Sequence, residues 1–308
     1  MKKIVFFIII ILILYYLYHI ITRNNKIDIK YIYNDIDSPK NILPKIIFMY
    51  WHEKEITNEL VKTNIDFIKT ILPKDFNLIV YNDETIKNEL SSEEYEIKNK
   101  SVIQHFSDII RIKLLKKYGG TWMDSSILIK DFSFLETIYT KYNDKPFDVF
   151  MYISNVFNGG NKISEQHFEN YFIVAPQNSI FINDLHKELL KAHSIGLLNY
   201  KLQLINENIN LKNVFHKTTD VYAICYGIIR KMNNLKKYNI AYDYADYSMY
   251  KYNISCSWNT QCIVNNYLKN KNNKDIYAIK IINNERQYIN HMYKGNIKRI
   301  FFDKKMNP

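Results

Sequence analysis

The stretch that decides the fold is Ser107-Asp108-Ile109-Ile110-Arg111-Ile112-Lys113-Leu114-Leu115-Lys116-Lys117-Tyr118-Gly119-Gly120-Thr121-Trp122-Met123-Asp124. Its first part carries apolar residues at helical spacing, which predicts an amphipathic helix from about residue 107 to 118. The glycine pair that follows suits a helix end and a tight reversal of the chain. Residues 121–124 then predict a short buried strand with Asp124 at its carboxyl end.

Three charged side chains of this stretch are candidates for a functional site. Asp108 and Arg111 are three residues apart, so they are neighbours on one face of the predicted helix. Asp124 ends the predicted strand, and open α/β sheets bind ligands at that edge. For Asp108 and Arg111 alone, the ordinary alternative is a surface ion pair worth under about 1 kcal/mol. The arrangement as a whole predicts a polar pocket that holds an anionic ligand.

The flanking segments predict an α/β domain. After Pro44, residues 45–52 form a continuous apolar run that is typical of a buried parallel strand. The further elements that we expect are a helix at 56–71, a strand at 76–81, a short helix from Glu84, strands at 147–153 and 168–175, and a helix at 179–192. Alternating strands and helices predict a parallel sheet built by right-handed crossovers. From about residue 230 the chain is rich in Asn, Lys and Tyr, and its pattern is weak.

Residues 4–21 contain no charged side chain and predict a single-pass membrane anchor. At about 1.5 Å per residue they span about 27 Å, close to the thickness of a hydrocarbon core. A cleaved signal peptide is the weaker interpretation because no small-residue cleavage site follows, and a buried core helix is unusual at an extreme N-terminus. Lysine and arginine flank both ends, so the charges do not set the orientation. We therefore expect a tail at 1–3, the anchor, a stem at 22–42 and one domain at 43–308.

The formal net charge of +11 does not by itself indicate nucleic-acid binding. Only five of the 42 basic residues are arginine, whereas surfaces that read bases usually depend on arginine. We interpret the charge as a solvated lysine surface with some attraction for anionic substrates or membrane faces, and expect no nucleic-acid partner.

The three cysteines leave two possibilities open: Cys256 and Cys262 pair and Cys225 is free, or all three are reduced.

The segment from Ser107 to Ser126 resembles the central block of the capsular polysaccharide synthesis family. That family belongs to the sugar transferases marked by a "DxD" motif, which include the initiating α-mannosyltransferase-like enzymes. Residues 44–51 resemble the first strand of the family, and residues 167–175 resemble its later "WFI-A" segment. The resemblance covers roughly residues 43–190.

The resemblance implies a GT-A-like α/β fold, with a Rossmann-type mixed sheet flanked by helices, and a hexosyltransferase-like enzyme. Such an enzyme moves a sugar from a nucleotide-sugar donor to a hydroxyl of a glycan or polysaccharide acceptor. It further implies that Asp108 and Arg111 hold the donor sugar and its phosphates, and that Asp124 lies beside a divalent metal ion, Mn²⁺ or Mg²⁺. A metal ion would stabilise the charge on the leaving nucleoside diphosphate, and Arg111 would add a guanidinium. Tyr50 or Trp51 would stack on the nucleotide base.

The sequence departs from the family's motif at one metal position. Ser126 occupies the place of the second carboxylate of Asp-x-Asp, and a hydroxyl is a poorer ligand for a hard metal ion. His291 resembles the C-terminal histidine that some GT-A enzymes use as a further ligand, although a lone histidine in a polar segment is more often simply exposed. Two alternatives stay open. Ser126 motivates a catalytically inactive nucleotide-sugar or glycan-binding protein of the same fold, and the net charge of +11 motivates a basic membrane-surface or nucleic-acid-binding protein, although the low arginine count argues against nucleic acid. Glu169 and Asp184 are both candidates for a general base, and nothing in the sequence singles out either.

Overall fold

The computed structural model describes residues 27–32, 40–162, 165–215, 217, 219–271 and 276–303. The predicted membrane span at 4–21 lies outside these residues. Within them, no helix combines the length and the apolar character that a membrane crossing requires.

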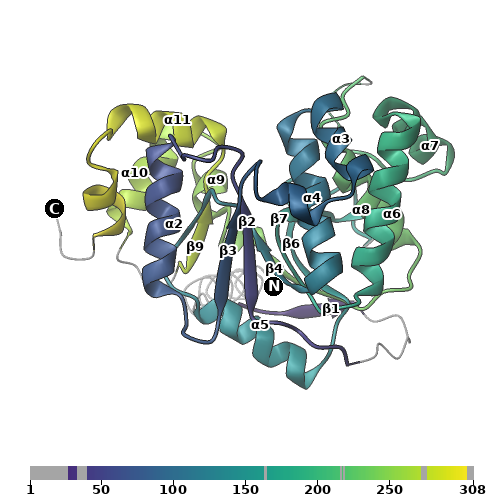
Figure 1. Cartoon of the computed structure of the whole chain (residues 1–308), viewed down its shortest axis with the longest axis horizontal. Helices are drawn as coiled ribbons and strands as arrows, with labels where there is room; N and C mark the ends of the chain where they lie inside the picture. Colours follow the sequence, from purple (N-terminus) through teal and green to yellow (C-terminus); the bar gives the residue numbers. More distant parts are fainter. Residues whose placement is uncertain are drawn as a thin grey trace, which may run out of the picture.

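A mixed seven-stranded sheet forms the centre of the domain (Figure 1). In spatial order its strands are β1 (Lys30–Ile32), β8 (Ile240–Tyr244), β6 (Val149–Ser154), β7 (His167–Ala175), β4 (Gly120–Met123), β2 (Ile46–Tyr50) and β3 (Asn77–Tyr81). As predicted, β2 runs parallel to both β3 and β4. Strand β7 runs antiparallel to both of its neighbours, β4 and β6, which makes the sheet mixed.

Helices cover both faces of this sheet (Figure 1). One face packs against α4 (Ile103–Tyr118), α6 (Ile180–Ile195), α7 (Leu197–Asn206) and α8 (Ile224–Asn234). The other face packs against α2 (Glu59–Ile71), α5 (Ser133–Asp144) and the strand β5 (Ile127–Ile129). The short elements η1 (Ile86–Glu89) and α3 (Ser92–Lys100) connect β3 to α4.

The last part of the chain builds a third apolar cluster beside the sheet. There, β9 (Ala278–Lys280) pairs antiparallel with β5 in a separate two-stranded sheet. The surrounding elements are η3 (Ala245–Tyr247), α9 (Lys251–Ser255), α10 (Thr260–Lys269), α11 (Asn283–Met292) and η4 (Lys298–Phe302). A disulfide joins Cys256 to Cys262, and Cys225 is a buried free thiol. One of the two cysteine arrangements left open by the sequence is therefore present.

The elements predicted between residues 45 and 192 are observed with small shifts in their ends. The helix expected from about residue 107 begins at Ile103 in the structure, and the strand expected at 121–124 is β4. One segment differs from expectation. Residues 30–32 fall within the predicted stem, yet they pair with β8 and add an edge strand to the sheet.

The glycine pair after α4 is required by both backbone conformation and space. Gly119 has φ +68° and Gly120 has φ +99°. A Cβ at Gly120 would lie 2.6 Å from the carbonyl oxygen of Ile46, and one at Gly119 would lie 2.5 Å from the backbone nitrogen of Gln177. A side chain at either position would push α4 and β4 away from neighbouring backbone.

We predict that Gly120→Ala lowers the free energy of unfolding by about 2–5 kcal/mol, because strain at positive φ adds to the clash with rigid backbone. Gly295→Ala is the matched control. Gly295 also has positive φ, but a Cβ there would meet nothing within 4 Å. Chemical denaturation of the two variants separates the effect of positive φ from that of the clash. Equal losses of unfolding free energy in the two variants would show that the contact with Ile46 is unimportant.

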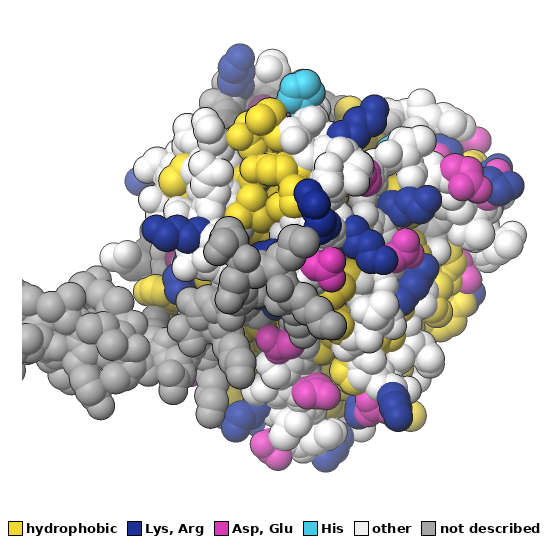
Figure 2. Space-filling view, turned by 90° about the vertical axis from the view of Figure 1, so that its left-hand side faces the viewer, with side chains coloured by type: hydrophobic (Ala, Val, Ile, Leu, Met, Phe, Trp, Pro, Cys, Tyr) yellow, Lys and Arg dark blue, Asp and Glu magenta, His cyan; other side chains and the backbone are white. Residues whose placement is uncertain are grey.

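The charged side chains of the face in Figure 2 are mixed in sign. Lysine and arginine side chains lie beside aspartate and glutamate on this face, and an apolar strip runs through its upper part. This distribution is typical of a solvated surface.

Candidate active site

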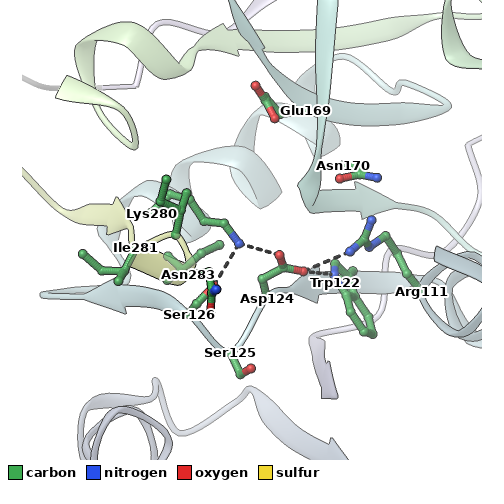
Figure 3. Close-up of polar contacts among 12 residues, drawn as sticks. Arg111, Trp122, Asp124, Ser125, Ser126, Glu169, Asn170, Lys280, Ile281 and Asn283 are labelled. Carbon is green, nitrogen blue, oxygen red and sulfur yellow. Dashed lines mark hydrogen bonds and ion pairs between the residues drawn. The ribbon is translucent and has the colours of Figure 1, made fainter. Parts of the chain in front are cut away.

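Asp124 is held at the carboxyl end of β4 by its backbone and its side chain (Figure 3). Its N–H donates to the carbonyl oxygen of Tyr171 at 2.9 Å, which extends the ladder between β4 and β7 by one residue. Its Oδ1 accepts hydrogen bonds from Trp122 Nε1 at 2.9 Å and Arg111 Nη2 at 3.1 Å. Its Oδ2 accepts one from Lys280 Nζ at 2.5 Å. One carboxylate therefore joins two cations.

Arg111 lies between two carboxylates. Its Nη1 donates to Asp108 Oδ1 at 2.6 Å, while its Nη2 reaches Asp124. Asn170 Nδ2 on β7 donates to the same Asp108 oxygen at 3.0 Å, and Tyr226 OH on α8 donates to Asn170 Oδ1 at 3.0 Å. The predicted pair of Asp108 and Arg111 is thus buried, with 7% and 4% of each residue exposed, and the alternative of a surface ion pair is excluded.

Burial and charge oppose each other within this cluster. Burial raises the pKa of Asp108 to about 6, even with Arg111 beside it. Burial would also raise the pKa of Asp124, but Lys280 and Arg111 outweigh it and hold that pKa below its ordinary value. Asp124 is therefore ionised at neutral pH. The pKa of Lys280 is lowered by burial and by the nearby Arg286 and Arg111, and Asp124 counteracts this.

Lys280 is a member of the charged cluster that was not predicted from the sequence. It ends β9, where the register sets it opposite Ile127, the residue that follows Ser126. Its Nζ contacts Ser126 Oγ at 2.9 Å as well as Asp124 (Figure 3). A signal was present in the sequence, because Lys280 interrupts the apolar run Tyr277-Ala278-Ile279-Lys280-Ile281-Ile282. A charged residue inside a buried strand pattern is more informative than an exposed one.

The side chains at the expected metal position do not fit a divalent ion. Lys280 Nζ lies between Asp124 Oδ2 and Ser126 Oγ, the two oxygens that the motif would offer to the metal. At an effective dielectric constant of roughly 20, a divalent ion about 4 Å from an ammonium is repelled by about 8 kcal/mol. Across the described residues, no three His, Cys, Asp or Glu side chains are grouped so that they could hold a metal ion. The residues present therefore do not support a metal-assisted step, and Mn²⁺ or Mg²⁺ stays a prediction from the resemblance.

The predicted donor-binding aromatics have different surroundings. Tyr50 is buried, donates its hydroxyl to Asp83 Oδ1 at 2.5 Å and packs edge-to-face on Phe106. Trp51 instead lines a surface cavity of about 570 Å³. The other residues of the cavity wall are Glu53, Thr57, Asn58, Glu59, Gln287, Asn290, His291 and Lys294. Trp51 is thus the aromatic side chain of the two that is placed to stack on a ligand.

Arg286 connects this cavity to the charged cluster. Its guanidinium carbon lies 5.9 Å from the centroid of the Trp51 ring. It also interacts electrostatically with Asp124 and Lys280. His291, predicted as a metal ligand, is exposed on the same helix, α11, and lines the cavity, whereas Asp124 and Ser126 do not line it.

A model of the family described as capsular polysaccharide synthesis protein matches residues 14–194, more than half of the chain. The chain belongs to this family. The expected family is therefore confirmed, and with it the predicted class of enzyme, a glycosyltransferase. The family match includes Asp108, Arg111 and Asp124 but ends well before Lys280.

Two solved structures are similar to the chain. One is titled "PaToxG Glycosyltransferase"; it is 16% identical with a TM-score of 0.35, and the match covers 63% of this chain and 71% of that chain. The other is a crystal structure of a glycosyltransferase involved in the glycosylation of the major capsid of PBCV-1. It is 10% identical with a TM-score of 0.38, and the match covers 81% of this chain and 99% of that chain. No curated protein matches the chain significantly.

A second group of buried polar side chains surrounds Glu169 on β7. Glu169 is 1% exposed, and its Oε2 accepts from Tyr250 OH at 3.2 Å and more distantly from Tyr226 OH at 3.4 Å. Its Oε1 has no hydrogen-bond partner within the described part of the chain. Burial raises the pKa of Glu169 to about 8. The other candidate base, Asp184, pairs with Lys237 and Tyr238 on the helical face.

The raised pKa of Glu169 predicts a pH-dependent stability. Between its ordinary pKa of 4.5 and about 8, the unfolded chain loses this proton while the folded protein keeps it. The free energy of unfolding therefore falls as pH rises, by up to about 1.4 kcal/mol per pH unit. The neighbouring His167, whose pKa burial lowers to about 3, has the opposite effect up to its ordinary value of 6.5.

Between pH 6.5 and 8 His167 no longer contributes, and comparison with Glu169→Gln cancels the contribution of Asp243, whose pKa burial raises to about 7. Across this window, we predict that the wild-type chain loses about 2 kcal/mol more of its unfolding free energy than Glu169→Gln does. Denaturation curves at several pH values measure this difference. Parallel pH profiles would contradict the assignment of a proton to Glu169.

Proposed function

We propose that this protein is a membrane-anchored, GT-A-like glycosyltransferase. It moves a sugar from a nucleotide-sugar donor to a hydroxyl of a glycan or polysaccharide acceptor. The observation that carries the proposal is the buried chain of charges Asp108–Arg111–Asp124–Lys280 at the carboxyl end of β4. Arg286, which interacts with Asp124 and lies against the Trp51 ring, links this chain to the cavity. The uncharged residues 4–21 support an anchor on the membrane.

The cavity suits the nucleotide part of the donor. Its volume of about 570 Å³ lies within the range of small-molecule sites. The Trp51 ring offers a stacking surface, and amide and carboxylate side chains on the wall can bond to base or ribose. Arg286, beside Trp51, attracts the diphosphate toward the charged cluster.

The charged cluster then acts on the bond that breaks. The acceptor hydroxyl oxygen forms a bond to C1 of the sugar, and the bond from C1 to the phosphate oxygen breaks with its electron pair on the phosphate. The hydroxyl proton is released to solvent. Negative charge therefore grows on the leaving nucleoside diphosphate, and fixed cations nearby stabilise it. Asp108 and Asp124 hold Arg111 in place for this role.

A donor screen on the full-length chain in detergent tests the proposal. UDP- and GDP-sugars are incubated with glycan acceptors, and both transfer and hydrolysis of the donor are measured. We expect turnover of at least one donor. Calorimetric binding of the nucleotide-sugars without any turnover would instead favour a catalytically inactive nucleotide-sugar or glycan-binding protein.

For the donor that is turned over, we predict that Trp51→Ala raises KM roughly 5- to 150-fold, because a stacked base contributes about 1–3 kcal/mol. Trp51→Phe keeps an aromatic surface and is the matched control, expected to retain most of the affinity. An unchanged KM in Trp51→Ala would place the base elsewhere.

A further inference from the structure

Lys280 takes part in the site although it is distant in sequence from the other members. The register of β5 and β9 and a hydrogen bond from Ile281 N–H to the carbonyl oxygen of Ser126, at 3.0 Å, fix its backbone beside the end of β4. The Lys280 N–H also donates to the carbonyl oxygen of Met249 at 2.9 Å. The side chain is 11% exposed and crosses to Asp124 and Ser126 (Figure 3). Hydrogen bonds therefore fix both the backbone and the side chain of Lys280.

The ammonium of Lys280 stands where a bridging cation would stand. It contacts one oxygen from each of the two motif positions, Asp124 and Ser126. The remaining oxygen of Asp124 is taken by Arg111 and Trp122. A hydroxyl at position 126 suits an ammonium better than it suits a hard divalent ion. A lysine ammonium in place of a metal ion thus accounts both for Ser126 in the Asp-x-Asp motif and for Lys280 beside it.

We propose that the Lys280 ammonium supplies the positive charge that DxD-type enzymes take from a metal ion, so that transfer by this protein needs no divalent cation. The inference rests on the proposed function and adds a residue and a cofactor requirement to it. When the bond between C1 and the phosphate oxygen breaks, the electron pair passes to the phosphate. Lys280 then offsets that charge together with Arg286, while Asp124 keeps the ammonium in place.

Metal binding tests the inference without any activity. Mn²⁺ alone is titrated into the full-length chain and followed by electron paramagnetic resonance, in which bound Mn²⁺ loses the signal of the free ion. We expect no binding to the wild-type chain, and binding to the double variant Lys280→Ala/Ser126→Asp, which restores two carboxylates and removes the competing charge. Stoichiometric binding to the wild type that is lost in Asp124→Asn would overturn the inference.

Transfer in the presence of a chelator provides the second test. With the donor found in the screen, we expect the wild-type rate to be unchanged by EDTA. We expect Lys280→Met, which keeps the side-chain stem, to lose about 10²- to 10³-fold in kcat, and Lys280→Arg to keep part of the rate. Lys269→Met, an exposed lysine of α10, is the control and keeps full activity. Loss of the wild-type rate in EDTA with recovery on adding Mn²⁺ would overturn the inference.

Failure of this inference differs from failure of the proposed function. If no donor is bound or turned over, the proposed function fails, while the Mn²⁺ titration still decides whether Lys280 keeps a metal ion out of the site. If transfer occurs only with Mn²⁺, the proposed function stands and the role of Lys280 is wrong.

Discussion

Asp124→Asn is expected to lower transfer by roughly 10²- to 10³-fold while the chain stays folded. The asparagine keeps the shape of the side chain but removes the charge that joins Arg111 to Lys280. Those cations would then face each other, their side chains only 5% and 11% exposed, and would move apart. Preorganised charges of this kind contribute on the scale of the expected loss.

The measurement is kcat and KM of the full-length variant, with circular dichroism to verify folding. Asp66→Asn is the matched control, because Asp66 has 61% of its side chain exposed on α2. A folded Asp124→Asn chain with wild-type kcat would show that the reaction takes place elsewhere in the molecule.

Arg111→Met is expected to lower the free energy of unfolding by about 3–5 kcal/mol, the usual effect of removing one partner from a buried ion pair. The change leaves Asp108 and Asp124 buried without the guanidinium that both contact. Lysine at position 111 would not restore the arrangement, since an ammonium cannot reproduce the fork that reaches two carboxylates.

A double-mutant cycle with Asp108→Asn separates this effect from lost packing. We expect Asp108→Asn/Arg111→Met to be more stable than Arg111→Met, because one of the unpaired carboxylates is then neutral. Arg299→Met, at an exposed arginine, serves as the control and should change stability by less than about 0.5 kcal/mol. Additive losses in the cycle would mean that Asp108 and Arg111 do not interact as the structure shows.

The predicted elements depend on patterns that are local in sequence. The helix and strand of residues 107–124 could be predicted because apolar periodicity, two glycines and a terminal acid occur within eighteen residues. The parallel pairing of β2 with β3 and β4 followed from alternating strands and helices. The antiparallel direction of β7 was not predicted. It follows from the pairing of β7 with β6, the strand that precedes it in the chain, because adjacent parallel strands need a long crossover connection.

The grouping of the candidate site residues was predicted in part for the same reason. Asp108, Arg111 and Asp124 lie within one segment, and the structure brings them into contact. Lys280 belongs to a region rich in Asn, Lys and Tyr, in which the apolar pattern of a strand is weak. It is also one of 42 basic residues, so its charge alone does not distinguish it. Its partnership with Asp124 is a tertiary contact between β9 and the end of β4, and no local propensity encodes such a contact.

The distance along the chain between Asp124 and Lys280, 156 residues, also orders events during synthesis. At about 5–20 residues per second, roughly 8–30 s pass between the two residues at the ribosome. Throughout that interval, a nascent domain that has already formed β2, β3 and β4 contains Asp124 without its partner Lys280. With Lys280 in its proposed role, sugar transfer has to wait until β9 has been translated and has docked on β5.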